Sequence, residues 1–308
     1  MTPDAQPTAA PTHAPFFVVY NPSSGSGDDV TEALQRMLGG RHELIAIRQG
    51  QVDAAAKDAV QRAKRAGGTV VAAGGDGTIR CVAKHALKEG VKVGILPRGT
   101  FNITGRTWGI PLELEASIQN LLDARVRRVQ VGTVNDHVFL VNASLGLYPE
   151  LLEEREQYKR QFGRKRTVAL LAGLVTILRH HKHLVLQSEH ELGSELVQAT
   201  TLFVGNNPMQ LEDVGLPESE DVKHGQLAAV FVKPVGRLAR LGLFVRGLAG
   251  KLGGAPELKD FSFEHLTVRP RRTNKKTLKV ALDGEIMRLA PPLEFKLTPE
   301  PLQLLVPR

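Results

Sequence analysis

Three loops of small and polar residues, each between a short apolar run and a helical pattern, constrain the fold of this 308-residue chain most strongly. The apolar runs are Phe16–Tyr20, Thr69–Ala73 and Val91–Leu96, and a loop that contains glycine follows each of them. Short apolar runs that alternate with helical segments are typical of a parallel sheet covered by helices. Because ligands of such sheets bind beyond the carboxyl ends of the strands, we expect the three loops to converge on one crevice.

The pattern of predicted elements changes near Arg125 and indicates two lobes. Before that point we expect a further strand at residues 43–48 and helices at residues 30–38, 52–66, 78–88 and 112–123. After it, strand-like runs dominate, at residues 128–131, 137–143, 183–187, 196–205, 226–232, 264–269 and 277–282, with helical stretches at 149–181 and 235–252. We therefore predict an α/β N-terminal lobe with a parallel sheet and a second, mostly-β lobe.

The expected domain boundaries follow from these patterns. Residues 1–15 are rich in proline, alanine and threonine and predict a disordered tail, not a signal peptide. Residues 16–127 form the first lobe, and we expect the last apolar run, Leu302–Val306, to return so that residues 296–308 complete it. Residues 128–295 form the second lobe, in keeping with a length that exceeds one average domain.

Composition is that of an ordinary soluble globular protein, with 42% hydrophobic and 23% charged residues. The longest strongly apolar run, Val168–Leu178, falls short of the roughly 20 residues that a membrane-spanning helix needs, so we expect no membrane crossing. A single cysteine, Cys81, rules out an internal disulfide and fits a reducing cytoplasm.

The charge balance favours an anionic partner. The formal net charge is +8 and the isoelectric point is near 9.7, which implies attraction to nucleic acid, an acidic membrane surface or a phosphorylated substrate. Nucleic-acid modules usually interleave basic and aromatic residues, and the sequence shows no such stripe and no zinc-finger or RNA-recognition signature. We therefore expect no nucleic-acid partner.

The turn Gly74–Thr78, with the sequence GGDGT, is the most informative of the three loops. Glycines let backbone N–H groups approach phosphate oxygens, and a helix start adds positive potential, although a lone turn of this kind is more often purely structural. Asp76 would repel a phosphate unless a cation lies between them, so it implies Mg²⁺ binding or proton transfer, with helix capping as the alternative. No Walker-type or G-x-G-x-x-G motif surrounds these turns, so the nucleotide site is of another kind.

Four motifs in order resemble the diacylglycerol kinase catalytic-domain family, which includes bacterial lipid kinases and sphingosine kinases. They are N-P-x-S-G at Asn21–Gly25, GGDGT at Gly74–Thr78, P-x-G-T-x-N at Pro97–Asn102 and L-D-G-E at Leu282–Glu285. The resemblance extends over nearly the whole chain from Phe16 onward. GGDGT also occurs in NAD kinases, but the first loop and the late motif favour the lipid kinases.

The resemblance implies a nucleotide-binding α/β lobe, a β-rich lipid-binding lobe and an active site in the cleft between them. It further implies ATP- and Mg²⁺-dependent transfer of the γ-phosphate to a lipid hydroxyl, diacylglycerol-like or sphingoid-like, at a membrane surface. The positions that it implies for the ATP site are Asn21, Ser24, Gly25, Gly74, Gly75, Asp76, Gly77, Thr78, Thr100 and Asn102.

The late motif supplies the acidic pair that the resemblance implies for catalysis, Asp283 and Glu285. One of them would accept the hydroxyl proton while Asp76 holds the nucleotide-bound metal. Without the family, Asp283-Gly284 between two apolar runs predicts a hairpin turn.

Three positions depart from the family pattern. Ile103, Gln130 and His224 stand where many relatives have acidic residues. In some members of the family, the acidic residue at the position of His224 helps to bind a structural Mg²⁺. Magnesium prefers hard oxygen ligands. We therefore expect that structural metal to be absent or relocated, whereas Asp76 is unaffected.

Two weaker features remain open at this point. The histidines at 180, 181 and 183 predict a solvated basic helix end, not a metal cluster. The stretch Arg237–Arg246 mixes apolar and basic residues at near-helical spacing and predicts either packing against the lobe or docking on an anionic membrane.

The expected protein is a cytoplasmic lipid kinase with peripheral membrane association. Two alternatives stay open: a soluble NAD-kinase-like enzyme, and a non-catalytic nucleotide- or lipid-binding pseudokinase suggested by the three missing acids.

Overall fold

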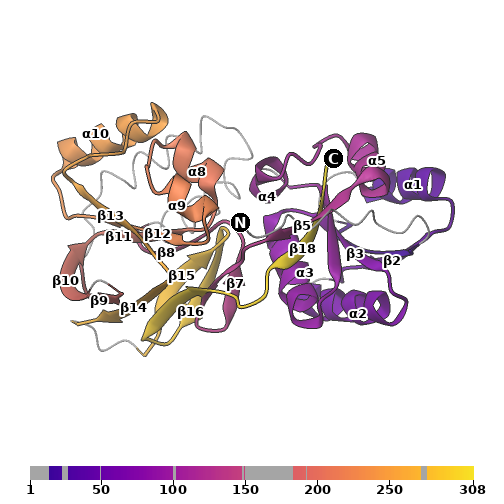
Figure 1. The fold of residues 1–308 in the computed structure, drawn as a ribbon, viewed down its shortest axis with the longest axis horizontal. Coiled ribbons are helices and arrows are strands. Elements are labelled where there is room, and N and C mark those ends of the chain that lie inside the picture. The colour runs from indigo at the N-terminus through magenta and orange to yellow at the C-terminus, as the bar shows by residue number, and fades with distance from the viewer. Residues whose placement is uncertain are drawn as a thin grey trace, which may run out of the picture. The chain divides into compact units, whose positions relative to one another are not determined.

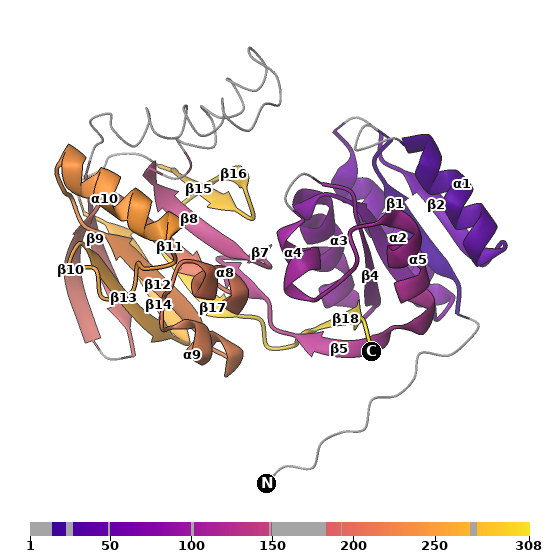
Figure 2. The ribbon, with the colours of Figure 1, turned by 90° about the horizontal axis from the view of Figure 1, so that it is seen from above.

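The computed structural model describes residues 14–22, 27–48, 50–99, 102–147, 149, 183–191, 193–271 and 276–308. These residues divide into two compact units (Figures 1 and 2). The first takes in the chain up to Val131 together with Pro299–Arg308, and the second is Gly132–Thr298. Within the described residues, no helix combines the length and the apolar character that a membrane span requires.

The first unit is an α/β layer structure around a six-stranded sheet of order β2-β1-β3-β4-β18-β5. Its strands are β1 (Phe16–Tyr20), β2 (His42–Ala46), β3 (Thr69–Gly74), β4 (Lys92–Pro97), β5 (Arg125–Val129) and β18 (Leu302–Val306). All neighbouring pairs are parallel except β18 and β5. Every residue of β3 is buried, as expected for a central strand covered on both faces.

In the described part of this unit, five helices flank the sheet: α1 (Gly27–Leu38), α2 (Val52–Arg65), α3 (Asp76–Glu89), α4 (Ile103–Thr107) and α5 (Leu114–Asp123). Helices α2 and α3 pack together on one face, and α1 and α5 pack together on the other (Figure 1). The core includes Leu34 and Leu38 of α1 and Val18 of β1. The predicted α/β lobe with a parallel sheet is therefore confirmed.

One prediction about this sheet is wrong. The sequence pattern assigned the first strand after Arg125 to the second lobe, but that strand, β5, pairs antiparallel with β18 in the first sheet. The sequence of β5, RVRRV, does not show a strand pattern because three arginines interrupt its apolar residues. Val129, at the end of the strand, is nevertheless buried.

The second unit contains two antiparallel six-stranded sheets, of order β10-β9-β14-β17-β6-β7 and β13-β12-β11-β8-β15-β16. Its strands are β6 (Gly132–Val134), β7 (His137–Phe139), β8 (Asn142–Gly146), β9 (Leu184–His190), β10 (Gly193–Ala199), β11 (Thr201–Gly205), β12 (Leu227–Val232), β13 (Leu258–Phe263), β14 (His265–Pro270), β15 (Leu278–Leu282), β16 (Glu285–Leu289) and β17 (Leu293–Leu297). Phe139 and Phe295 from one sheet and Phe231 and Phe263 from the other are fully buried in one core, which confirms the mostly-β character of this unit.

Three helices of the second unit are described: α8 (Pro208–Asp213), α9 (Ser219–Lys223) and α10 (Arg237–Leu248). They contribute Leu211, Val222 and the half-buried Leu243 to a smaller core with the second sheet. The helical stretch predicted at 149–181 lies outside the described residues except for Pro149, and so do the histidines at 180 and 181.

The run expected as one strand at 196–205 is two strands that belong to different sheets. The chain leaves β10 after Ala199 and enters β11 at Thr201. Thr200 separates them: its N–H donates to the Val232 carbonyl at 2.8 Å, and its carbonyl accepts from the Leu147 N–H at 3.0 Å. A continuous apolar pattern does not reveal such a change of sheet.

Candidate active site

The carboxyl ends of β1, β3 and β4 lie at one edge of the first sheet, because these strands are adjacent, parallel and in register. Tyr20 stands opposite Ala73, and Gly74 stands opposite Pro97. The residues that follow the three strands therefore begin side by side, as the strand–loop–helix pattern predicts. Of the first and third loops, Ser24, Gly25 and Thr100 lie outside the described residues, while Asn21 follows β1 directly.

The turn Gly74–Thr78 and the third loop, which begins at Pro97, contact each other through their glycines. A Cβ atom on Gly99 would lie 2.6 Å from the Gly75 Cα, and one on Gly74 would lie 2.7 Å from the Thr78 side chain. Only glycine therefore fits at Gly74 and Gly99, since real Cβ atoms do not approach other heavy atoms so closely. The Arg98 N–H also donates to the Gly74 carbonyl at 2.9 Å. The two loops form a tight backbone surface from which N–H groups can reach a phosphate.

Asp76 is the first residue of α3, and its carboxylate binds the start of α4. Oδ2 accepts from the Ile103 N–H at 3.2 Å, and Oδ1 accepts from the Thr104 N–H at 3.0 Å. These N–H groups begin a helix and lack partners within it. A carboxylate accepts about four hydrogen bonds, so Asp76 can hold α4 and still offer an oxygen to a cation. The capping role is therefore real, but it serves α4 and not the helix that contains Asp76.

Asn102 shapes the third loop. Its backbone is left-handed, with φ of 50°, and its side-chain Oδ1 accepts from the Gly99 N–H at 2.7 Å. Asparagine tolerates this conformation better than most residues. The side chain is buried, so its position within the loop is fixed by the fold.

Asp283 and Gly284 form the two-residue hairpin turn between β15 and β16, in which Leu282 pairs with Glu285. Both turn residues have positive φ, of 48° and 85°, as a turn of this length requires. The hairpin interpretation of this dipeptide is therefore confirmed. It does not exclude a catalytic role, because the turn fixes where both carboxylates lie.

The Asp283 carboxylate is held by three backbone N–H groups. Oδ2 accepts from Leu140 at 2.8 Å, and Oδ1 accepts from Val141 at 2.8 Å and Asn142 at 3.0 Å. Three such donors stabilise the ionised carboxylate and tie the hairpin to the segment that enters β8. Glu285, in contrast, is exposed.

A group of polar side chains beside this hairpin was not predicted from the sequence. Asn206 and Asn207, which follow β11, are both buried. The Asn206 side chain donates to the Leu140 carbonyl at 3.0 Å, and the Asn142 side chain donates to Gln210 Oε1 at 2.9 Å. Two asparagines and a proline directly after an apolar run were the available signal.

The part of the chain that carries the three loops also matches a known family. Residues 15–134 match the diacylglycerol kinase catalytic domain. A protein named "Probable lipid kinase YegS-like" from Pseudomonas aeruginosa is 38% identical over 135 residues, which cover 42% of this chain and 43% of that protein. A diacylglycerol kinase of Staphylococcus haemolyticus is 28% identical over 134 residues, which cover 42% of this chain and 41% of that protein. The chain thus matches less than half the length of either relative.

The fold similarity extends over both units. The crystal structure of a diacylglycerol kinase from Bacillus anthracis superposes with a TM-score of 0.71 at 18% sequence identity, and the match covers 95% of this chain and 96% of that one. The chain therefore has the two-lobe fold of that structure. The region that matches the diacylglycerol kinase catalytic domain holds Asp76 and Asn102, whereas Asp283 and Glu285 lie outside it.

The three positions that depart from the family pattern fall in both units. Ile103 lies in the first unit and uses its backbone N–H to bind Asp76, and Gln130 follows β5 in the same unit. His224 ends α9 in the second unit, where its Nδ1 lies 2.7 Å from the Glu220 carbonyl oxygen.

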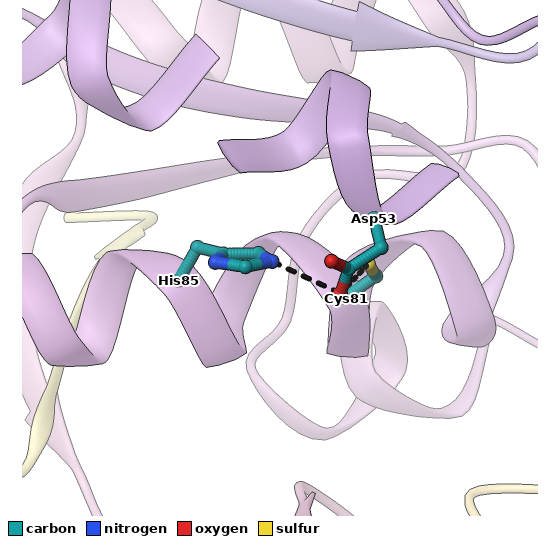
Figure 3. Close-up of side chains that lie close together, drawn as sticks. All are labelled: Asp53, Cys81 and His85. Atoms are coloured by element: carbon teal, nitrogen blue, oxygen red, sulfur yellow. Dashed lines mark hydrogen bonds and ion pairs between the residues drawn. The ribbon is translucent and has the colours of Figure 1, made fainter. Parts of the chain in front are cut away.

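Asp53, Cys81 and His85 gather between α2 and α3 (Figure 3). Asp53 Oδ1 lies 3.0 Å from His85 Nε2 and 3.8 Å from Cys81 Sγ. The Lys84 ammonium also donates to this oxygen, at 2.9 Å, and this contact is the largest cause that lowers the pKa of Asp53. Because Lys84 already supplies the positive charge that a metal would bring, we interpret the group as an ion-pair network that joins α2 to α3.

A second acidic group lies in the second unit, around Glu218. Burial, together with the neighbouring carboxylates of Asp260 and Asp221, raises the pKa of Glu218 to about 7. The side chain is almost fully buried and one of its oxygens has no hydrogen-bond partner among the described residues. Like charges this close together cannot all ionise without cost, so Glu218 loses its proton only as the pH approaches about 7, well above the range in which a glutamate ordinarily ionises.

Proposed function

We propose that this protein is an ATP- and Mg²⁺-dependent lipid kinase that transfers a phosphoryl group to a lipid hydroxyl. The observation that carries the proposal is the contact between Gly75 and Gly99, which brings two of the three loops together at the strand ends. The match of residues 15–134 to the diacylglycerol kinase catalytic domain supports the same activity.

The loops fit the phosphates of a nucleotide. Gly74 and Gly75 place no side chain over the backbone of the turn, and the N-terminus of α3 adds positive potential at the same place. Asp76 would offer its remaining carboxylate lone pairs to the magnesium ion that ATP carries. When bound, ATP supplies the γ-phosphoryl group and magnesium neutralises its charge.

Glu285 is the general base that the geometry favours. A base must accept a proton during the reaction, and the three N–H donors on Asp283 stabilise its ionised form and take three of the about four acceptor positions of its carboxylate. Glu285 follows in the same hairpin and is exposed to solvent. Asp283 would therefore position the hairpin, and Glu285 would take the proton of the lipid hydroxyl.

The acceptor is proposed to be a lipid alcohol, diacylglycerol-like or sphingoid-like, at the surface of a membrane. The names of the relatives support this class: one is a diacylglycerol kinase and the other a lipid kinase. The protein would work in the cytoplasm and bind the membrane peripherally.

The test is phosphate transfer from labelled ATP to a panel of diacylglycerol, sphingoid bases and NAD, with ATP binding measured separately. We expect label in a lipid, no label in NAD, and loss of transfer with retained ATP binding in Glu285→Gln. Label in NAD only would favour the NAD-kinase alternative. ATP binding without transfer to any acceptor would favour the non-catalytic sensor that Ile103, Gln130 and His224 suggest.

A further inference from the structure

Helix α10 presents large apolar side chains to solvent. Leu238 is 85% exposed, Leu248 is 71% exposed and Val245 is 56% exposed. Among the described residues, only two other large apolar side chains are exposed, Leu112 and Leu196, and they lie on separate elements. Isolated exposed apolar residues are common on protein surfaces, but two leucines and a valine exposed on one helix form a patch typical of an interaction surface.

The exposed side chains form one stripe along the helix. Leu238, Val245 and Leu248 follow one another at intervals of seven and three residues and are all exposed, so they lie along one side of the helix. On a different face, Leu243 packs against the smaller core of the second unit. The inward contact fixes the orientation of α10, and its outward face is apolar where an ordinary surface helix is polar.

The segment that carries this stripe has basic residues as its only charged residues. From Lys233 to Lys251 the sequence contains three arginines, two lysines and no aspartate or glutamate. Arg237 and Arg246 are exposed at either end of the helix. An apolar stripe with a basic border matches the boundary between acyl chains and anionic headgroups.

We propose that the α10 surface, made of the apolar stripe with Arg237 and Arg246, docks on an anionic membrane. This inference rests on the proposed function, because a lipid kinase must reach an acceptor that is held in a bilayer. The apolar stripe inserts at the headgroup boundary, and the arginines bind lipid phosphates. Charge complementarity selects a membrane over a second copy of this chain, since two such surfaces would repel each other.

The test is binding of the full-length protein to vesicles of phosphatidylcholine alone or of equal parts phosphatidylcholine and phosphatidylglycerol. We expect binding to the anionic vesicles, weak binding to neutral ones, and loss of binding at high salt. The double variant Leu238→Ser/Leu248→Ser should bind anionic vesicles at least about tenfold more weakly. Leu196→Ser, on β10 of the same unit, is the matched control and should bind as wild type does.

A charge variant separates the two parts of the surface. Arg237→Gln/Arg246→Gln should weaken binding to anionic vesicles about thirtyfold, because it removes two basic residues that each contribute about 1 kcal/mol near such a surface, and should leave binding to neutral vesicles unchanged. Equal binding of wild type and the leucine variant to anionic vesicles would overturn the proposal. The proposal would also be overturned if the leucine variant still bound anionic vesicles but no longer self-associated in gel filtration.

The outcome is distinguishable from failure of the proposed function. Transfer to a lipid dispersed in detergent should be unchanged in both α10 variants, since their substitutions lie outside the ATP loops and the Asp283 hairpin. Vesicle binding without phosphate transfer would sink the kinase proposal and leave the α10 surface intact. If the wild-type protein transfers phosphate to the dispersed lipid but does not bind anionic vesicles, only the proposal for the α10 surface is contradicted.

Discussion

Replacement of Asp283 by asparagine separates the structural role of this residue from the chemistry proposed for Glu285. Asparagine keeps the size of the side chain and tolerates the φ of 48° at this position, so the turn itself is not strained. It replaces one carboxylate oxygen by an amino group, which cannot accept from the Leu140 N–H, and it removes the charge from the bonds to Val141 and Asn142. The substitution therefore perturbs all three hydrogen bonds.

The expected cost is at least about 2.5 kcal/mol in the free energy of unfolding of the second unit, since the bond to Leu140, worth about 1.5–3 kcal/mol with a charged acceptor, is lost and the other two each fall to the roughly 1 kcal/mol of a neutral bond. Glu285→Gln is the matched control in the same hairpin; its side chain is exposed, so we expect a change within about 0.5 kcal/mol.

Urea unfolding followed by circular dichroism measures the loss, and amide hydrogen exchange at residues 140–142 locates it. The single tryptophan, Trp108, lies in the first unit beside Arg127, so its fluorescence provides an internal reference for that unit. An Asp283→Asn protein with wild-type stability and unchanged exchange at 140–142 would refute this argument.

Three further substitutions test other parts of the structure. Gly99→Ala places a Cβ 2.6 Å from the Gly75 Cα and should weaken ATP binding at least about tenfold in calorimetry, whereas Gly236→Ala, which has open space for a Cβ, should not. Asp76→Asn removes an acceptor from the start of α4, so amide exchange there should rise and transfer should fall; unchanged exchange would contradict the observed hydrogen bonds. Because burial raises the pKa of Glu218 from 4.5 to about 7, the folded protein holds a proton that the unfolded chain releases, and stability should fall by up to about 3 kcal/mol as pH rises through this window. Denaturation profiles of Glu218→Gln should show a weaker dependence of stability on pH, and this variant should be more stable than wild type above pH 7. An equal dependence on pH in both proteins would contradict the prediction.

The loops of the first unit could be predicted because their signal is local. An apolar run, a glycine turn and a helical pattern follow one another within a few residues, and the rule that ligands bind at carboxyl ends of strands then places the loops together. The hairpin at Asp283-Gly284 is local in the same sense.

Contacts between distant residues were beyond such patterns. The partners of Asp283 lie more than 140 residues away in the sequence, and those of Asp76 lie 27 and 28 residues away. The motifs L-D-G-E and GGDGT do not indicate which backbone groups these carboxylates bind. That removal of Asp283 should cost stability follows from its three donors and not from the motif.

Element boundaries failed where polar residues interrupt a strand. Strand β13 (Leu258–Phe263) was missed because Lys259 and Asp260 break its apolar pattern, although Leu258 and Phe263 are buried. For α10, the sequence allowed packing or membrane docking, and only the structure shows that Leu243 faces the core while Leu238 faces solvent.

The most direct test of the account is transfer of the γ-phosphate of ATP to a lipid alcohol by the wild-type protein and by Glu285→Gln. The account predicts labelled lipid with the wild type and none with the variant, while both proteins bind ATP equally. Labelled lipid at the wild-type rate with Glu285→Gln would remove the proposed base. A wild-type protein that binds ATP and labels no lipid would contradict the kinase assignment itself.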